Sequence, residues 1–167
     1  MKNVRMETGF REKNLGSGGK DEVEFLISVN PGEEPRALSK IASGGENSRI
    51  MLAIKSVLSD KDAIDSMIFD EIDTGVSGSG ATKIGEKLSS LSKSKQIICI
   101  THQAQIAAMA DTHFHIEKNT RDGRTYTTVT NITGEKRAEE LARIMGGDKY
   151  SKALMDSARE MLGNLKE

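Results

Sequence analysis

Two short apolar runs near the middle of the chain are each followed by side chains that could do chemistry. Asp70 and Glu71 come directly after Met67–Phe69, and His102 follows Gln96–Ile100 after one threonine. A continuous apolar run is typical of a parallel strand buried on both faces, and open α/β sheets bind ligands beyond the carboxyl ends of such strands. We therefore expect the two carboxylates and the histidine to lie at one edge of one sheet.

The adjacent carboxylates predict a metal-dependent reaction at this edge. Asp70 could hold Mg²⁺ directly or through water, and Glu71, pointing the other way, could orient and deprotonate a water molecule. With Asp73 they could equally hold two metal ions, as in a nuclease, although no further cluster of Asp or His completes such a site. His102 alone would often be a structural hydrogen-bonding residue, but its place beside the Asp70 strand favours a role in the reaction.

A second candidate site is the Ser-Gly-Gly-Glu segment Ser43–Glu46. Ser43 can cap a helix and Glu46 can complete a capping box, which would explain the segment without any ligand. The free amides and the positive dipole end of that helix could also bind an anion such as phosphate. Gly44 and Gly45 would let the anion approach the backbone closely.

Hydrophobic periodicity predicts the elements that position these groups. Alternating apolar residues predict strands over 5–10 and 22–29, and a crossover helix over 79–92 would join the strands at 67–69 and 96–100 in a right-handed parallel unit. A hairpin is expected around Asp122-Gly123, and its first strand would carry His113 and His115 on a polar face. Apolar stripes at helical spacing predict the helices, with these members: Ile50, Ile54, Val57 and Leu58; Ala81, Ile84, Leu88 and Leu91; Ala138, Leu141, Ala142 and Met145; Leu154, Ala158, Met161 and Leu165.

The composition indicates one domain in a reducing compartment. The 167 residues carry a formal net charge of −1, so overall charge gives no argument for nucleic acid binding. Tryptophan is absent and aromatic residues make up 4%, which argues against base-stacking platforms. Cys99 is the single cysteine, no stretch approaches the roughly 18 apolar residues of a membrane span, and the N-terminus lacks the apolar core of a signal peptide. We expect a cytoplasmic protein without a membrane partner.

Taken in order, the motifs resemble the C-terminal half of an ATPase head of the ATP-binding-cassette type, in its structural-maintenance-of-chromosomes (SMC) form. Ser43–Glu46 looks like the signature motif, Asp70 and Glu71 look like the end of Walker B with its catalytic glutamate, Asp73 looks like the D-loop, and Thr101-His102 looks like the switch-histidine loop. The resemblance is closer still to the RecN family of bacterial DNA repair proteins, over nearly the whole chain and most clearly at 23–33, 69–78, 101–111 and 139–147.

For the fold, this resemblance implies the C-terminal lobe of an α/β P-loop NTPase head, with a mainly parallel sheet flanked by helices and without the Walker A half. We expect 1–167 to form a single domain. Its parts would be N-terminal strands and a loop over 1–35, the core with the signature, Walker B, D-loop and histidine loop over 36–118, and a hairpin strand with C-terminal helices over 119–167. Because Walker A and a coiled coil are missing, the chain would be a fragment that starts where the coiled coil returns to the head.

For the function, the resemblance implies ATP binding and hydrolysis with Mg²⁺ at a head–head interface, driving DNA double-strand break repair and recombination at the nucleoid. Asp70 would serve Mg²⁺, Glu71 would be the general base, and His102 would sense or polarise the γ-phosphate. Ser43, Gly44, Gly45 and Glu46 would bind the nucleotide of the opposite head, and Asp73 would also bind nucleotide. The partners would be the N-terminal half of the same head, a second head and DNA, and the isolated fragment would be inactive.

Two alternatives stay open at this point. The chain could be the head lobe of another SMC-like repair ATPase, of the Rad50-like or RecF-like kind. It could also be a non-catalytic module that binds DNA or a partner head, which nucleotide-stimulated dimerisation without turnover would favour.

Overall fold

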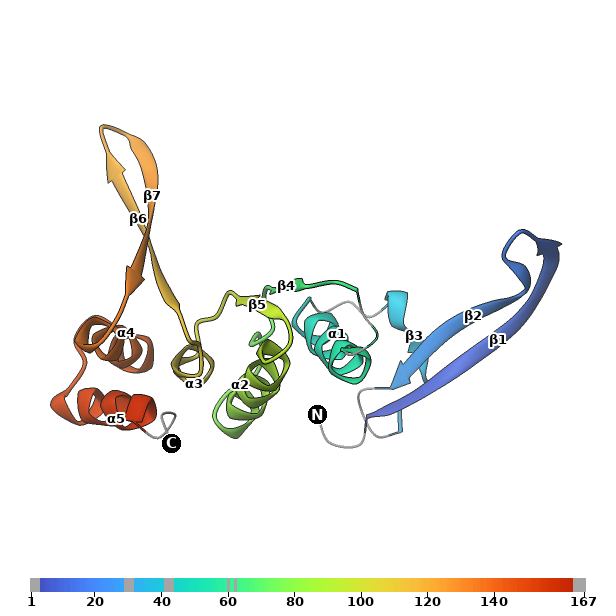
Figure 1. Cartoon of the computed structure of the whole chain (residues 1–167), viewed down its shortest axis with the longest axis horizontal. Coiled ribbons are helices and arrows are strands. Elements are labelled where there is room, and N and C mark those ends of the chain that lie inside the picture. Colours follow the sequence, from blue (N-terminus) through green and yellow to red (C-terminus); the bar gives the residue numbers. More distant parts are fainter. Residues whose placement is uncertain (1–3, 29–31, 41–43, 60, 62, 164–167) are drawn as a thin grey trace. The chain divides into compact units, whose positions relative to one another are not determined.

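The computed structural model describes residues 4–28, 32–40, 44–59, 61 and 63–163 (Figure 1). By their contacts the residues fall into two compact units, Met1–Asn47 and Ser48–Glu167, and each is described here by itself. None of the helices within the described ranges is long and apolar enough to cross a membrane.

The first unit contains a long antiparallel hairpin. β1 (Arg5–Gly16) pairs with β2 (Gly19–Ser28), and β2 pairs in turn with the short β3 (Arg36–Ala37), which leads into a 3-10 turn over Leu38–Lys40.

Both strands of the hairpin extend closer to the turn than the sequence predicts. Opposite charges explain the extension, because Arg11 lies opposite Glu22 and the Lys20 ammonium lies 3.2 Å from the Glu12 carboxylate. Such cross-strand pairs favour continued pairing even without apolar residues. Val29, the predicted end of the second strand, lies outside the described residues.

The second unit contains the predicted strand–helix–strand. β4 (Ser66–Phe69) and β5 (Gln96–Cys99) pair in parallel with Phe69 opposite Cys99, and the crossover helix α2 spans Ser79–Ser92 as predicted. The predicted apolar stripe of α2 packs against one face of the strand pair. The resulting core consists of Leu52, Met67, Phe69, Ile72, Ala81, Ile84, Leu88, Leu91 and Ile106.

The predicted apolar stripe of α1 (Gly44–Leu58) is partly wrong. Val57 is 83% exposed and Leu58 is also exposed, whereas Leu52, outside the predicted stripe, is buried in the core. The physical reason is that the packed face of this helix carries polar groups such as the guanidinium of Arg49, which bonds to backbone carbonyls. A face that is satisfied by hydrogen bonds is not marked by hydrophobic spacing.

Three helices share a second core made mainly of small residues. α3 (Ala104–Ala108), α4 (Glu135–Gly146) and α5 (Lys152–Gly163) bury Ala104, Ala107, Ala108, Ala138, Leu141, Ala142 and Ala158. Arg137 of α4 donates to the carbonyls of Ala107 at 3.1 Å and Ala108 at 2.7 Å, so it caps the end of α3. α4 ends at the predicted glycine pair, and Gly147 takes a φ of 77° there.

The predicted hairpin near the C-terminus is formed by β6 (His113–Arg121) and β7 (Arg124–Ile132). Asp122 and Gly123 have φ angles of 51° and 73°, which is the left-handed geometry that a two-residue hairpin turn of this type requires. The sequence therefore predicts both the turn and the backbone angles that it requires.

The expected exposure of the two faces of β6 is wrong. His113 and His115 are half-buried, while Phe114 and Ile116 on the other face are exposed. The reason is that the histidine face lies toward α4, where the Nδ1 atom of His115 is 3.2 Å from the carboxylate of Glu140.

The described residues form the predicted parallel pair and the predicted β elements near each end of the chain. Within the described residues only β4–β5 is a parallel pair, and the sheets β1–β2–β3 and β6–β7 are antiparallel. The α/β class and the flanking helices agree with the prediction. A parallel pair is normally part of a larger sheet covered on both faces, and here α2 covers one face.

Candidate active site

The loop after β4 presents two carboxylates in a strained turn. Asp70 and Glu71 are both exposed, and Glu71 has a φ of 57°, which costs a residue with a Cβ about 1–2 kcal/mol. One carboxylate oxygen of Asp70 accepts the amide N–H of Glu71 at 2.8 Å. Strained backbone of this kind clusters at functional sites, so the geometry singles out Glu71.

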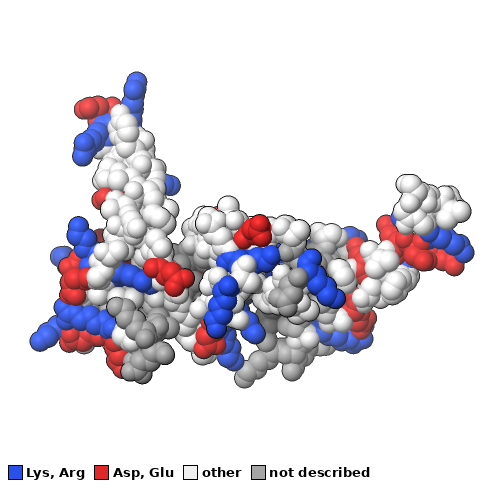
Figure 2. Space-filling view, viewed as in Figure 1, with Lys and Arg blue, Asp and Glu red and all other residues white. Residues whose placement is uncertain are grey.

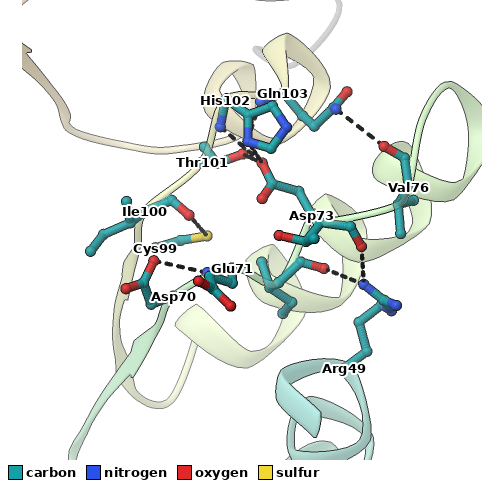
Figure 3. Close-up of polar contacts among 12 residues, drawn as sticks. Arg49, Asp70, Glu71, Asp73, Val76, Cys99, Ile100, Thr101, His102 and Gln103 are labelled. Carbon is teal, nitrogen blue, oxygen red and sulfur yellow. Dashed lines mark hydrogen bonds and ion pairs between the residues drawn. The ribbon is translucent and has the colours of Figure 1, made fainter. Parts of the chain in front are cut away.

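The N-terminal part of α1 anchors this turn from one side. The Ser48 hydroxyl donates to the carbonyl of Asp70 at 2.9 Å. The Arg49 guanidinium, which Figure 3 shows, donates to the carbonyls of Ile72 at 3.0 Å and Thr74 at 2.8 Å. The Ile72 side chain is fully buried beneath the turn. Sequence reasoning missed Ser48 and Arg49, and the available signal was two polar residues on one helix face just after the Ser-Gly-Gly-Glu segment.

The segment after β5 anchors the turn from the other side, through Asp73. This side chain is 1% exposed, and its Oδ2 atom accepts hydrogen bonds from the Thr101 hydroxyl and from the His102 amide at 2.8 Å. Gln103 adds a bond from its side-chain amide to the carbonyl of Val76 at 3.1 Å. The buried carboxylate is thus satisfied by donors, as a buried charge must be.

The imidazole of His102 lies at the surface of this edge. Its side chain is 70% exposed, and its Nδ1 atom is 3.2 Å from Oδ2 of Asp73 (Figure 3). Because Phe69 and Cys99 are partners in register, the residues that follow β4 and β5 lie at the same edge. The structure therefore brings Asp70, Glu71 and His102 together, with Asp73 buried between the two loops.

The other predicted residues have different outcomes. Ser43 lies outside the described residues, and Gly44, Gly45 and Glu46 form the first turn of α1, in the unit Met1–Asn47. The start of a helix of this length fits an anion site, and binding there stays a prediction.

The carboxylates of this edge do not favour the two-metal alternative. Asp70 uses one oxygen for the Glu71 amide, which leaves a second exposed oxygen as the hard ligand that Mg²⁺ prefers. The Asp73 carboxylate bonds instead to Thr101 and His102. Within the part of the chain that the structure describes, no three Asp, Glu, His or Cys side chains form a group that could hold a metal.

Cys99 lies behind this edge and was not assigned a chemical role from the sequence. Burial first, and then the negative charges of Asp73 and Asp70, raise the pKa of its thiol to about 11. The thiol is therefore protonated at neutral pH, which makes it a poor nucleophile.

Comparison with known proteins identifies sequence relatives of this chain. No model of a known protein family matches it. The DNA repair protein RecN of Treponema pallidum is 48% identical over 151 residues, which are 90% of this chain and 26% of that protein. RecN of Bacillus subtilis is 49% identical over 148 residues, covering 89% of this chain and 26% of that protein. The chain thus spans about a quarter of the length of the curated relatives it matches.

Comparison with solved structures identifies the fold. A chain from a study of ATP-driven dimerisation and DNA-stimulated activation of SMC ATPases aligns with a TM-score of 0.53 at 23% identity, over 86% of this chain and 84% of that one. The Smc head domain of Pyrococcus yayanosii, with a coiled coil and joint, aligns with a TM-score of 0.59 at 17% identity, over 99% of this chain and 26% of that one. By sequence, then, the chain is a relative of the C-terminal portion of the DNA repair proteins named RecN, and its fold is that of an SMC-type ATPase head.

Proposed function

We propose that the chain is the C-terminal lobe of an ATPase head in a RecN-like protein, where ATP hydrolysis at a head–head interface drives DNA double-strand break repair and recombination. The observation that carries the proposal is the edge of β4–β5, where Asp70, the strained Glu71 and the exposed imidazole of His102 come together. The DNA role rests on the names of the relatives.

The residues of this edge divide the work by position. Asp70 would hold Mg²⁺ through its second oxygen, and Mg-ATP, when bound, would supply the phosphate that water attacks. Glu71 would accept a proton from the attacking water, since this residue is exposed and lies in a left-handed turn next to Asp70. The exposed ring of His102 would contact the γ-phosphate. Ser43–Glu46 would bind the nucleotide held by the opposite head.

Exposed apolar surfaces support the proposal that another part of the whole protein packs against this chain. On the face of β4–β5 that points away from α2, Ile68 is 69% exposed, and its neighbours Ile98 and Ile100 are 48% and 51% exposed. Parallel strands are normally buried on both faces. Since the relatives extend well beyond the matched quarter of their length, we propose that the N-terminal half of the same head covers this face and supplies Walker A.

The hairpin β6–β7 has a similar uncovered surface. Arg121, Asp122 and Arg124 lie at its tip and Glu117 and Lys118 lie midway along β6, and the rest of the hairpin carries no charged residue (Figure 2). Ile116 and Val129 face each other across the strands and are exposed with Phe114 on the same face. This surface adds to the apolar area that the isolated chain leaves in water.

The test is to reunite the chain with its N-terminal half and measure Mg²⁺-dependent ATP turnover. Glu71→Gln keeps the size of the side chain but cannot accept a proton, so turnover should fall by about 10²–10⁴-fold while ATP-dependent head dimers live longer. Asp70→Asn should instead weaken nucleotide binding and dimerisation together. Glu139→Gln, an exposed carboxylate on α4, is the matched control and should behave like the parent.

Light scattering and turnover assays on these variants decide the question. Parental turnover in Glu71→Gln would rule out its role as the general base. Nucleotide-stimulated dimers without any turnover in the reunited parent would favour the non-catalytic interaction module instead.

A further inference from the structure

We infer that Asp73 is a positioning residue that holds His102 in the tautomer with its proton on Nδ1, which leaves Nε2 as the acceptor of this exposed ring. What Nε2 does there rests on the proposed function. The contact itself is a property of this chain and can be tested without nucleotide.

The inference starts from how the Asp73 carboxylate is used. It is 1% exposed, and a single oxygen, Oδ2, receives the Thr101 hydroxyl, the His102 amide and the Nδ1 side of the His102 ring (Figure 3). The first two contacts fix the backbone path after β5. The third, at 3.2 Å, acts on the ring alone.

A carboxylate oxygen at this distance decides which ring nitrogen carries the proton. A lone pair on Nδ1 would face a negatively charged oxygen and be repelled, whereas a proton there is attracted. The partner of one imidazole nitrogen thus sets the state of the other, and Nε2 becomes the acceptor in the neutral ring.

Because of the position of Asp73, its contact with His102 connects two separate loops. Asp73 is two residues after Glu71, in the loop that follows β4, and His102 belongs to the loop that follows β5. One buried carboxylate therefore ties together the two loops that carry the proposed base and the proposed phosphate contact. Orientation of reacting groups is worth large factors in rate, and the tie supplies it from within one chain.

The direct test reads the tautomer of His102 by long-range ¹⁵N–¹H correlation in the ¹⁵N-labelled chain. Only three histidines are present, so a His102→Gln variant assigns the signal. At a pH where the ring is neutral, the parent should show the proton mainly on Nδ1, and Asp73→Asn should move the population toward Nε2. A parent ring protonated on Nε2, or an unchanged population in Asp73→Asn, would overturn the inference.

Thr101→Val separates positioning from general loosening. It removes the hydroxyl that bonds to Asp73 and leaves the ring contact in place, so the tautomer should stay as in the parent even if the thermal midpoint falls. A shift in Thr101→Val as large as that in Asp73→Asn would assign the effect to loosening and overturn the inference. Asp156→Asn, an exposed carboxylate on α5, controls for the charge change.

A second arm uses the reunited head. There Asp73→Asn should lower kcat at least about tenfold, and more than Thr101→Val does. A parent head without turnover would refute the proposed function, whereas the tautomer measurement would still decide the role of Asp73. The two failures are therefore distinguishable.

Discussion

Replacing Arg49 tests whether a polar contact, rather than apolar packing, holds the turn that carries Glu71. The Arg49 guanidinium donates to the carbonyls of Ile72 and Thr74 at 3.0 and 2.8 Å. Arg49→Met keeps the aliphatic stem, which packs along the helix, and removes only the donors. The substitution therefore isolates the two hydrogen bonds.

The expected loss follows from the burial of each acceptor. A hydrogen bond to a charged group is worth about 1.5–3 kcal/mol, and the bond to Ile72 lies in a partly buried place where water cannot fully replace it. The bond to Thr74 is exposed, so water recovers most of it. We expect Arg49→Met to lower the free energy of unfolding by about 2 kcal/mol, or roughly 4–8 °C in the thermal midpoint for a chain of this size. Arg49→Lys should lose less, because an ammonium can still reach one carbonyl.

Tyrosine fluorescence during urea or thermal unfolding measures this loss in the relevant unit. Tryptophan is absent and the two tyrosines, Tyr126 and Tyr150, both lie within Ser48–Glu167, so the signal reports on that unit. Lys83→Met on the exposed side of α2 is the matched control and should change stability by less than about 0.5 kcal/mol. If Arg49→Met costs no more than this control, the turn is held by the packing of Ile72 and the reasoning is refuted.

Two further predictions concern the shifted pKa values of Cys99 and His113. The raised pKa of Cys99, about 11, should make its alkylation by iodoacetamide at neutral pH about 10²-fold slower in the folded chain than in urea, and equal rates would contradict the burial of the thiol. Burial first, and then the positive charge of Arg137, lower the pKa of His113, so the folded state favours neutral imidazole. Its contribution to stability is complete above the ordinary pKa of about 6.5 and is lost as the pH falls from there through the lowered value. His113→Gln should flatten this part of the stability profile, and an unaltered profile in a urea titration series would contradict it.

The sequence predicts the parts of the fold that depend on periodic burial or on special backbone angles. α2 was predicted within its observed bounds because Ala81, Ile84, Leu88 and Leu91 all face one core. The turn at Asp122-Gly123 was predicted because few residue pairs accept two positive φ angles. In both cases one local rule decides the structure.

The parts that were wrong depend on tertiary partners that local rules cannot see. Val57 belongs to a helical stripe by spacing but is 83% exposed, since the packed face of α1 is satisfied through Arg49. His113 and His115 look polar, yet they lie on the more buried face of β6 because Glu140 of α4 pairs with His115. An apolar run likewise indicates that a strand is buried without showing which chain segment buries it.

In the candidate site, too, sequence spacing predicts some residues and only the contacts in the structure identify the others. Its reactive residues were found from their position after two apolar runs, whereas the residues that hold them were not. Glu71 sits in a conformation that costs about 1–2 kcal/mol, and the estimated contribution of Arg49 is of similar size. Asp73 fixes the far side of the same turn to Thr101 and His102. A strained turn persists only when contacts with its surroundings outweigh the cost of its backbone conformation. Here Arg49 holds the turn from one side and Asp73 holds it from the other.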